Sequence, residues 1–251
     1  MIALGDVAII GGGCYGSFYA TQLAKAHAKG AVRWRRLLII DRAADCAIVP
    51  TLPTIPAAEL VVSEWGAFLD AWLDDSTRQD DDQIVPSPLM PHLLAQWLTR
   101  RAAEAWPEHS VSMVKVEAAV GTPFDWLHPD DGVRYVSFAD WLCPTHCVEP
   151  ATCPVIAAPR TWEMGDAVVA WTEARRAERP TAGPALFTCR HMVHGVGMYR
   201  ARLAFEGFQA LATQMAGTPD GADLVVGSVS ACHGAVGVLR VNGERGGGRK
   251  T

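Results

Sequence analysis

The fold is decided by a short stretch near the start of the chain. Residues 6–16 read Asp6-Val7-Ala8-Ile9-Ile10-Gly11-Gly12-Gly13-Cys14-Tyr15-Gly16. An apolar, strand-like run passes directly into glycines, and a helical pattern follows over residues 15–28. Glycine permits a tight turn and lets a ligand come close to the backbone. The stretch therefore predicts a strand, a glycine-rich turn and a helix, with the turn suited to a phosphate group.

The glycines also follow a known spacing. Gly11, Gly13 and Gly16 form Gly-x-Gly-x-x-Gly, between the strand and the helix that this motif requires. On these residues the chain resembles the FAD/NAD(P)-binding Rossmann superfamily. The resemblance implies that the loop residues hold the pyrophosphate of FAD or NAD(P), and we expect this of Gly11, Gly13, Cys14, Tyr15 and Gly16.

The same resemblance extends to the end of the next predicted strand, residues 37–40. It implies that Asp41 hydrogen-bonds the adenosine ribose. Arg42 could accept the 2′-phosphate of NADP, or it could be an ordinary surface arginine. The spacing from Gly11 to Asp41 is longer than usual, because residues 27–36 add a basic, tryptophan-containing insertion.

Strand and helix patterns continue to alternate along the chain. Strands are predicted at residues 111–120, 133–138, 185–188 and 224–229, and helices at residues 64–73, 163–177 and 199–215. Such alternation is typical of βαβ units. We therefore expect one Rossmann-like α/β domain over residues 1–251, with a mainly parallel sheet, helices on both faces, a Cys/Pro-rich metal loop at residues 143–160 and a flexible tail at residues 244–251.

Two other segments have a structural interpretation. Trp65, Phe68, Leu69, Trp72 and Leu73 have the spacing of one buried helix face, so both tryptophans are expected in the core rather than on a stacking surface. The acidic run at residues 74–75 and 80–82 is expected to be a solvated loop.

The cysteine segment is the most unusual part of the sequence. Cys143, Cys147 and Cys153 lie in a proline-rich stretch that resembles ferredoxin-type cluster loops, although the spacing differs from the usual one. Cys189 and Cys232, each after a predicted strand, are candidates for a fourth ligand. The alternatives are a zinc site, formed by three thiolates and His146 or by four thiolates, and three cysteines without a metal.

Composition narrows the possible partners. The 251 residues carry a net charge of −5, which disfavours nucleic acid as a partner. The apolar runs are far shorter than the ~20 residues of a membrane span, and no signal peptide is recognised, so we expect a cytoplasmic protein. Seven cysteines are an odd number, which disfavours a disulfide framework.

Two functions are consistent with these patterns. The first is a dinucleotide-binding oxidoreductase or electron-transfer subunit with an iron–sulfur cluster, working with a redox partner subunit or complex. The alternative is a non-catalytic Rossmann-like binding or assembly protein stiffened by structural zinc. Hydrolase, P-loop and zincin classes lose support because their motifs are absent from the sequence.

Overall fold

The computed structural model describes residues 1–87, 92–144, 147–218 and 220–244. The chain divides into two compact units, where the sequence patterns suggested one domain. The first unit comprises Met1–Leu93, Cys143–Arg160 and Cys189–Arg202. The second unit comprises Leu94–Leu142, Thr161–Thr188 and Leu203–Thr251. The predicted flexible tail lies almost wholly outside the described residues.

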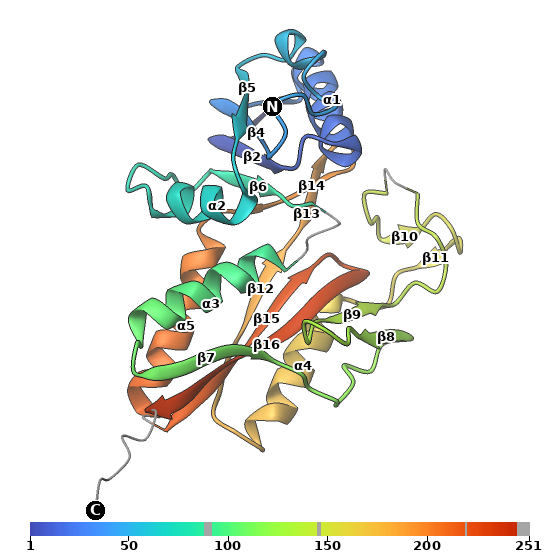
Figure 1. Ribbon diagram of the computed structural model, residues 1–251. Helices are drawn as coiled ribbons and strands as arrows, with labels where there is room; N and C mark the ends of the chain where they lie inside the picture. The colour runs from blue at the N-terminus through green and yellow to red at the C-terminus, as the bar shows by residue number, and fades with distance from the viewer. Residues whose placement is uncertain (88–91, 145–146, 219, 245–251) are drawn as a thin grey trace, which may run out of the picture. The chain divides into compact units, whose positions relative to one another are not determined.

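The first unit is built on a six-stranded sheet whose order is β13-β14-β6-β2-β4-β5 (Figure 1). Its four neighbouring strands from β6 to β5 are parallel, whereas β14 is antiparallel to β6 and to β13. The strands are β2 (Asp6–Ile10), β4 (Arg36–Asp41), β5 (Ala58–Val62), β6 (Gln83–Val85), β13 (Arg190–Val193) and β14 (Val196–Arg200).

Burial on both faces explains why β2 and β4 are continuous apolar runs. Val7 and Ile9 on one face pack with Leu23 of helix α1 (Cys14–Ala28). The alternate residues Ala8 and Ile10, on the opposite face, are also buried. Strands covered on both sides are typical of parallel sheets. Helix α2 (Trp65–Asp74) follows β5 and contacts β4.

Short additional strands account for the insertion between the glycine loop and Asp41. β3 (Val32–Arg33) pairs in parallel with β1 (Ile2–Ala3) and forms a separate two-stranded sheet. Trp34 then donates its indole N–H to the carbonyl oxygen of Pro56 at 2.8 Å. The first unit also contains the 3₁₀ helix η1 (Leu52–Thr54) and the hairpin of β10 (Thr152–Cys153) and β11 (Ala158–Pro159).

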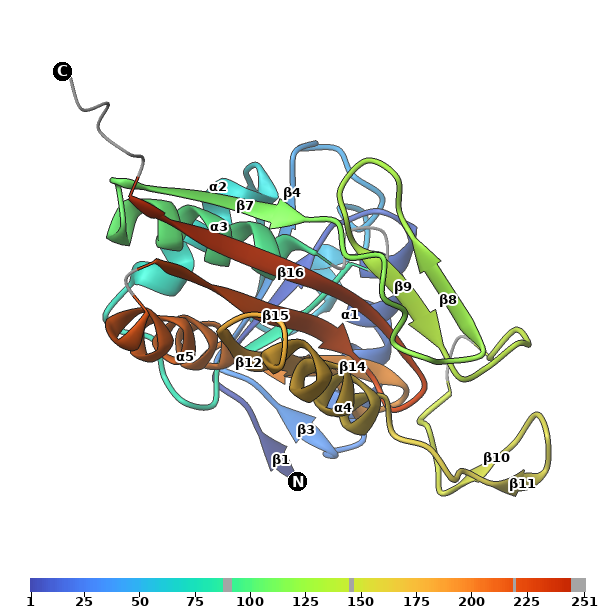
Figure 2. The ribbon, with the colours of Figure 1, turned by 90° about the horizontal axis from the view of Figure 1, so that it is seen from below.

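The second unit contains a mixed, largely antiparallel sheet with order β12-β15-β16-β9-β8, and β7 also pairs with β16 (Figure 2). Only the pair β12–β15 is parallel among its described strands. The strands are β7 (His109–Val114), β8 (Phe124–Leu127), β9 (Arg134–Ser137), β12 (Thr181–Thr188), β15 (Gly221–Val229) and β16 (His233–Glu244).

Helices cover both faces of this second sheet. Gly165 of α4 (Met164–Arg176) faces Leu186, and Gly207 of α5 (Leu203–Gly217) faces Ala185. Successive strand residues point to opposite faces, so α4 and α5 lie on opposite sides of β12. Helix α3 (Leu93–Ala105) packs against α5.

The prediction of a single, mainly parallel Rossmann-like sheet is wrong. The described residues form two six-stranded sheets, and the second is mostly antiparallel. The prediction failed chiefly at β16, which pairs with β15, β9 and β7 but contains Gly234, Gly237 and Gly243. In addition, Tyr199 and Arg200 belong to β14, so the helix predicted at residues 199–215 begins at Leu203.

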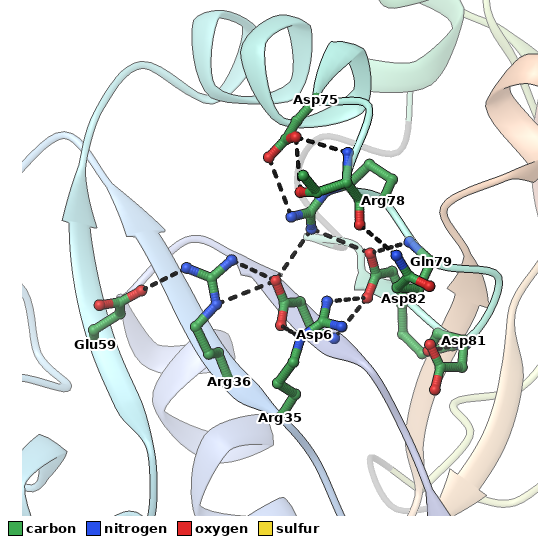
Figure 3. Close-up of polar contacts among 11 residues, drawn as sticks. Asp6, Arg35, Arg36, Glu59, Asp75, Arg78, Gln79, Asp81 and Asp82 are labelled. Carbon is green, nitrogen blue, oxygen red and sulfur yellow. Dashed lines mark hydrogen bonds and ion pairs between the residues drawn. The ribbon is translucent and has the colours of Figure 1, made fainter.

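A buried charge network joins the amino ends of the parallel strands in the first unit (Figure 3). The Asp6 carboxylate, fully buried, accepts hydrogen bonds from Arg35 Nε at 2.6 Å and Arg36 Nη2 at 2.5 Å. Arg78 pairs with both Asp6 and Asp82 at 3.2 Å. Burial alone would raise the pKa of Asp6, but these hydrogen bonds outweigh it and hold that pKa well below its usual value.

Asp82 corrects the expectation of a solvated acidic loop. Its side chain is fully buried and accepts the backbone N–H groups of Asp6 at 2.7 Å and Gln79 at 2.9 Å. Asp74, Asp75, Asp80 and Asp81 are exposed as expected. The acidic run therefore anchors the amino end of β6 through one of its members.

A second buried carboxylate stabilises the second unit. Asp223 on β15 is fully buried and pairs with Arg175 of α4 at 2.9 Å and Arg240 of β16 at 2.8 Å. Burial opposes ionisation, but the hydrogen bonds and positive charges of Arg240, Arg175 and Arg179 together outweigh it and lower the pKa of Asp223. Through these ion pairs, the carboxylate on β15 connects this strand to α4 and to β16.

Candidate functional site

The glycine loop has a backbone that only glycine accommodates at two positions. Gly11 has a φ of +93°, and its N–H donates to the Ile40 carbonyl oxygen at 2.7 Å. A Cβ on Gly16 would lie 1.7 Å from the Gly11 carbonyl oxygen. The start of α1 is therefore packed against the turn that follows β2, as the spacing predicts.

Asp41 holds the loop from the neighbouring strand. Its Oδ2 accepts the Gly12 N–H at 2.7 Å, and its Oδ1 accepts the Ala43 N–H at 2.9 Å. The Gly12 carbonyl oxygen in turn accepts the Ile48 N–H at 3.1 Å. Asp41 is thus engaged by the protein backbone, and its contact with a ribose stays a prediction.

The amino end of α1 is open to solvent. Gly13, which precedes the helix, is exposed, and so are Cys14 and Tyr15. In the part of the chain that the structure describes, no side chain caps this helix end. The first amide groups of a helix have no intrahelical partner and carry a partial positive charge, which attracts anions.

Arg42 and Trp65 lie beside the loop at the same, carboxyl edge of the sheet. Trp65 Cζ2 is 3.6 Å from the position that a Cβ on Gly11 would take. The Arg42 guanidinium carbon lies 5.8 Å from the centroid of the Trp65 ring. Arg42 Nε is 4.0 Å from Glu64 Oε1, and both of these side chains are largely exposed.

The predicted metal ligands do not come together. Cys143 and Cys147 are half-buried, and Cys153 is buried in the β10–β11 hairpin opposite Ala158. Cys189 follows β12 in the chain but belongs to the first unit, whereas Cys232 belongs to the second. Within the described ranges, no group of three or more His, Cys, Asp or Glu residues could hold a metal ion. The predicted metal loop is therefore wrong there, and His146 lies outside those ranges.

The surroundings of Cys189 disfavour the thiolate form of its side chain. Burial, and secondarily the charge of Glu149, raise the pKa of its thiol to about 12. Glu149 also lies 3.7 Å from His191 Nδ1 and donates its backbone N–H to Cys147 Sγ at 3.3 Å. In the absence of a bound metal ion, this environment favours the protonated thiol.

Cys232 lies in a polar turn of the second unit. Its sulfur accepts the Trp162 indole N–H at 3.3 Å. The next residue, His233, has its Nδ1 2.9 Å from Ser137 Oγ, and Ser137 also bonds to the backbone of Ala139. These contacts orient the turn between β15 and β16, and nothing in the sequence pattern indicated Ser137.

The fold defines a mixed α/β protein with two compact units, each built on a mixed sheet, and the first unit contains the glycine loop. Residues 94–242, more than half of the chain, match the family model AF_1314_C, described as "Uncharacterized protein, C-terminal domain". The chain belongs to this family. The matched stretch leaves the glycine loop outside it.

No curated protein and no solved structure matches the chain. Among the described residues, no helix is both long and apolar enough to cross a membrane.

Sequence reasoning missed two residues at the loop. Trp65 was placed in the core, yet it is only partly buried, unlike Phe68, Leu69, Trp72 and Leu73 of the same helix. Cys46 Sγ would lie 2.5 Å from a Cβ on Gly12, so this thiol packs against the loop. The position of Trp65 directly after a parallel strand was the available signal.

Proposed function

We propose that the first unit binds a dinucleotide, NAD(P) or FAD, at the loop from Gly11 to Gly16. The protein would then act as an oxidoreductase or electron-transfer subunit that uses this dinucleotide. One observation carries the proposal: Gly13 is exposed at the start of α1, and, apart from its chain neighbours, no described residue has an atom within 4 Å of the position that a Cβ would take. A pyrophosphate can approach the backbone there, where a side chain would obstruct it.

The loop is also organised before any ligand arrives. Gly16 packs on Gly11, and Asp41 fixes the Gly12 amide. Binding then requires little ordering of the backbone, which favours affinity. The exposed amides at the start of α1 supply the partial positive charge that a pyrophosphate needs.

The redox part of the proposal rests on the resemblance of this loop to dinucleotide-binding proteins. A bound NAD(P) or FAD supplies hydride or electron transfer, and the protein contributes position and electrostatics. Here the loop would hold the pyrophosphate, and Asp41 would lie on the adenosine side.

A Gly13→Asp variant tests the proposal on the full chain. Gly13 has a φ of −75°, which any residue adopts, and aspartate is favoured at this helix position, so stability is expected to stay the same or rise. Its carboxylate would occupy the position of the pyrophosphate and repel its negative charge, so affinity for NADH, NADPH or FAD is expected to fall at least about tenfold. Titration calorimetry measures affinity, and urea unfolding measures stability.

Ser76→Asp is the matched control. Ser76 is exposed and precedes β6, so this substitution adds the same negative charge at the opposite edge of the parallel strands. It is expected to leave affinity unchanged. Failure of the wild-type protein to bind any of the three dinucleotides, or equal binding by Gly13→Asp, would reject the proposal.

A further inference from the structure

Along the carboxyl edge of the first sheet, three features occur in strand order. The glycine loop follows β2, Asp41 ends β4, and Trp65 follows β5, and these three strands are neighbours. With strands about 4.8 Å apart, β5 lies roughly 10 Å from β2. An extended nucleoside diphosphate can cover this span, with its phosphates at the loop and its base near Trp65.

Trp65 differs from the other large residues of its helix. Its indole is partly exposed and borders Gly11, whereas Trp72 in the same helix is 6% exposed. Its indole N–H is enclosed and, within the described part of the chain, has no hydrogen-bond acceptor. The core residues Trp72 and Trp97 also have indole N–H groups without an acceptor among the described residues, so the partial exposure of Trp65 beside the loop is what distinguishes it.

One group that lies over the Trp65 ring is exposed and weakly held. Arg42 lies over the indole, but its side chain is 66% exposed and its nearest carboxylate, Glu64, is 4.0 Å away. An exposed ion pair at that distance holds a side chain weakly. A planar ligand can therefore displace Arg42 without breaking a buried contact.

We propose that Trp65 is the stacking surface for the base of the bound nucleotide, and that Arg42 moves aside when the base binds. This inference rests on the proposed dinucleotide function and names the residue that recognises the base. The ligand class it defines is a nucleotide with an aromatic base joined to a pyrophosphate. Arg42 contributes no essential charge when the ligand lacks a 2′-phosphate.

The test uses ADP and inorganic pyrophosphate as probes of the full-length protein. Trp65→Ala is expected to weaken ADP binding about tenfold or more, because base–aromatic stacking contributes on this scale. Trp65→Phe, which keeps an aromatic ring, is expected to stay within about threefold of wild type, and Arg42→Ala likewise. Pyrophosphate, which has no base, is expected to bind all four proteins equally.

Tryptophan emission gives a second readout that does not depend on the alanine variant folding. ADP is expected to quench emission in the wild-type protein and in Trp34→Phe, but not in Trp65→Phe. Trp34 is a matched control because it is also partly exposed but precedes β4, at the opposite edge.

The outcomes separate the two proposals. If ADP and the dinucleotides bind but Trp65→Ala binds ADP as tightly as wild type, the stacking inference is overturned and the dinucleotide function stands. If Arg42→Ala loses as much affinity as Trp65→Ala, charge rather than stacking recognises the ligand, and the inference is again overturned. If the wild-type protein binds none of them, both proposals are rejected.

Discussion

Replacing Asp6 with asparagine is the sharpest test of the charge network in the first unit. The change keeps the shape of the side chain but removes its charge. The buried carboxylate accepts from Arg35 at 2.6 Å, from Arg36 at 2.5 Å and from Arg78 at 3.2 Å. An asparagine amide nitrogen donates rather than accepts, so at least one guanidinium loses its acceptor.

The expected loss follows from how much of the network can be rehydrated. Removing one partner of a buried ion pair costs about 3–5 kcal/mol. Arg35 and Arg36 are each 47% exposed, so water can replace part of the lost contact. Asp82 also continues to pair with Arg35 and Arg78. The free energy of unfolding is therefore expected to fall by about 3 kcal/mol at neutral pH, the lower end of that range.

The pH dependence of this loss has a definite sign. The folded-state pKa of Asp6 is held below the unfolded value of about 3.9, so its contribution to stability is present above that pH. The contribution disappears as the pH falls through the folded-state pKa. The stability difference between wild type and Asp6→Asn is therefore largest near neutral pH and shrinks below about pH 4.

Urea unfolding followed by circular dichroism at about pH 7 and about pH 3 measures both quantities. Glu59→Gln is the control, because Glu59 is 54% exposed and lies 3.7 Å from Arg36. It is expected to change stability by less than about 0.5 kcal/mol. A loss below about 1 kcal/mol for Asp6→Asn at neutral pH, or an equal loss at the acidic pH, refutes the reasoning.

Two further predictions concern the glycine loop. Gly16→Ala places a Cβ 1.7 Å from the Gly11 carbonyl oxygen, so it is expected to lower stability by about 2 kcal/mol or more and to abolish dinucleotide binding. Urea unfolding and calorimetry check this, and a stable, binding-competent variant would contradict it. In Asp41→Asn only one side-chain oxygen remains to accept, whereas the two carboxylate oxygens now accept the N–H groups of Gly12 and Ala43. The loss of one of these hydrogen bonds is expected to lower the free energy of unfolding by about 1 kcal/mol and the affinity for the dinucleotide roughly tenfold. Unchanged affinity would show that the Gly12 amide is fixed without the charge.

The first part of the fold could be predicted from sequence because its signals are local. The strand predicted at residues 6–10 is β2, and the helix predicted at residues 15–28 is α1 within one residue. Continuous apolar runs, glycine spacing and helical periodicity act over a few residues, and each is visible without knowing the rest of the chain.

The second part could not be predicted in the same way because its pairing is long-range. β16 pairs with β15 through a tight turn, but also with the much earlier strands β9 (Arg134–Ser137) and β7 (His109–Val114). The sequence patterns did not predict this strand, and its glycines are atypical of a strand interior. In the structure they allow close packing, since a Cβ on Gly237 would lie 2.4 Å from Met113 Cε. Such a contact has no signature in the local sequence.

The prediction of a metal loop in the cysteine segment was wrong for a different reason. Spacing suggested a shared centre, but convergence depends on where distant segments are placed. Cys153 lies opposite Ala158 in the β10–β11 hairpin, and burial raises the pKa of the Cys189 thiol. Closely spaced cysteines indicate a metal only when the backbone directs their sulfur atoms to one point, which spacing alone does not determine.

The two edges of the first sheet differ in their expected contribution to ligand binding. At the amino edge, Asp6 and Asp82 are fully buried and paired with arginines, so these carboxylates contribute to stability. At the carboxyl edge, the loop is fixed by Asp41 while Gly13 stays exposed. Substitutions at the amino edge are therefore expected to change unfolding without changing affinity, whereas Gly13→Asp changes affinity without lowering stability. A loss of affinity in Asp6→Asn that accompanies its loss of stability would mean that the loop depends on the charge network across the sheet.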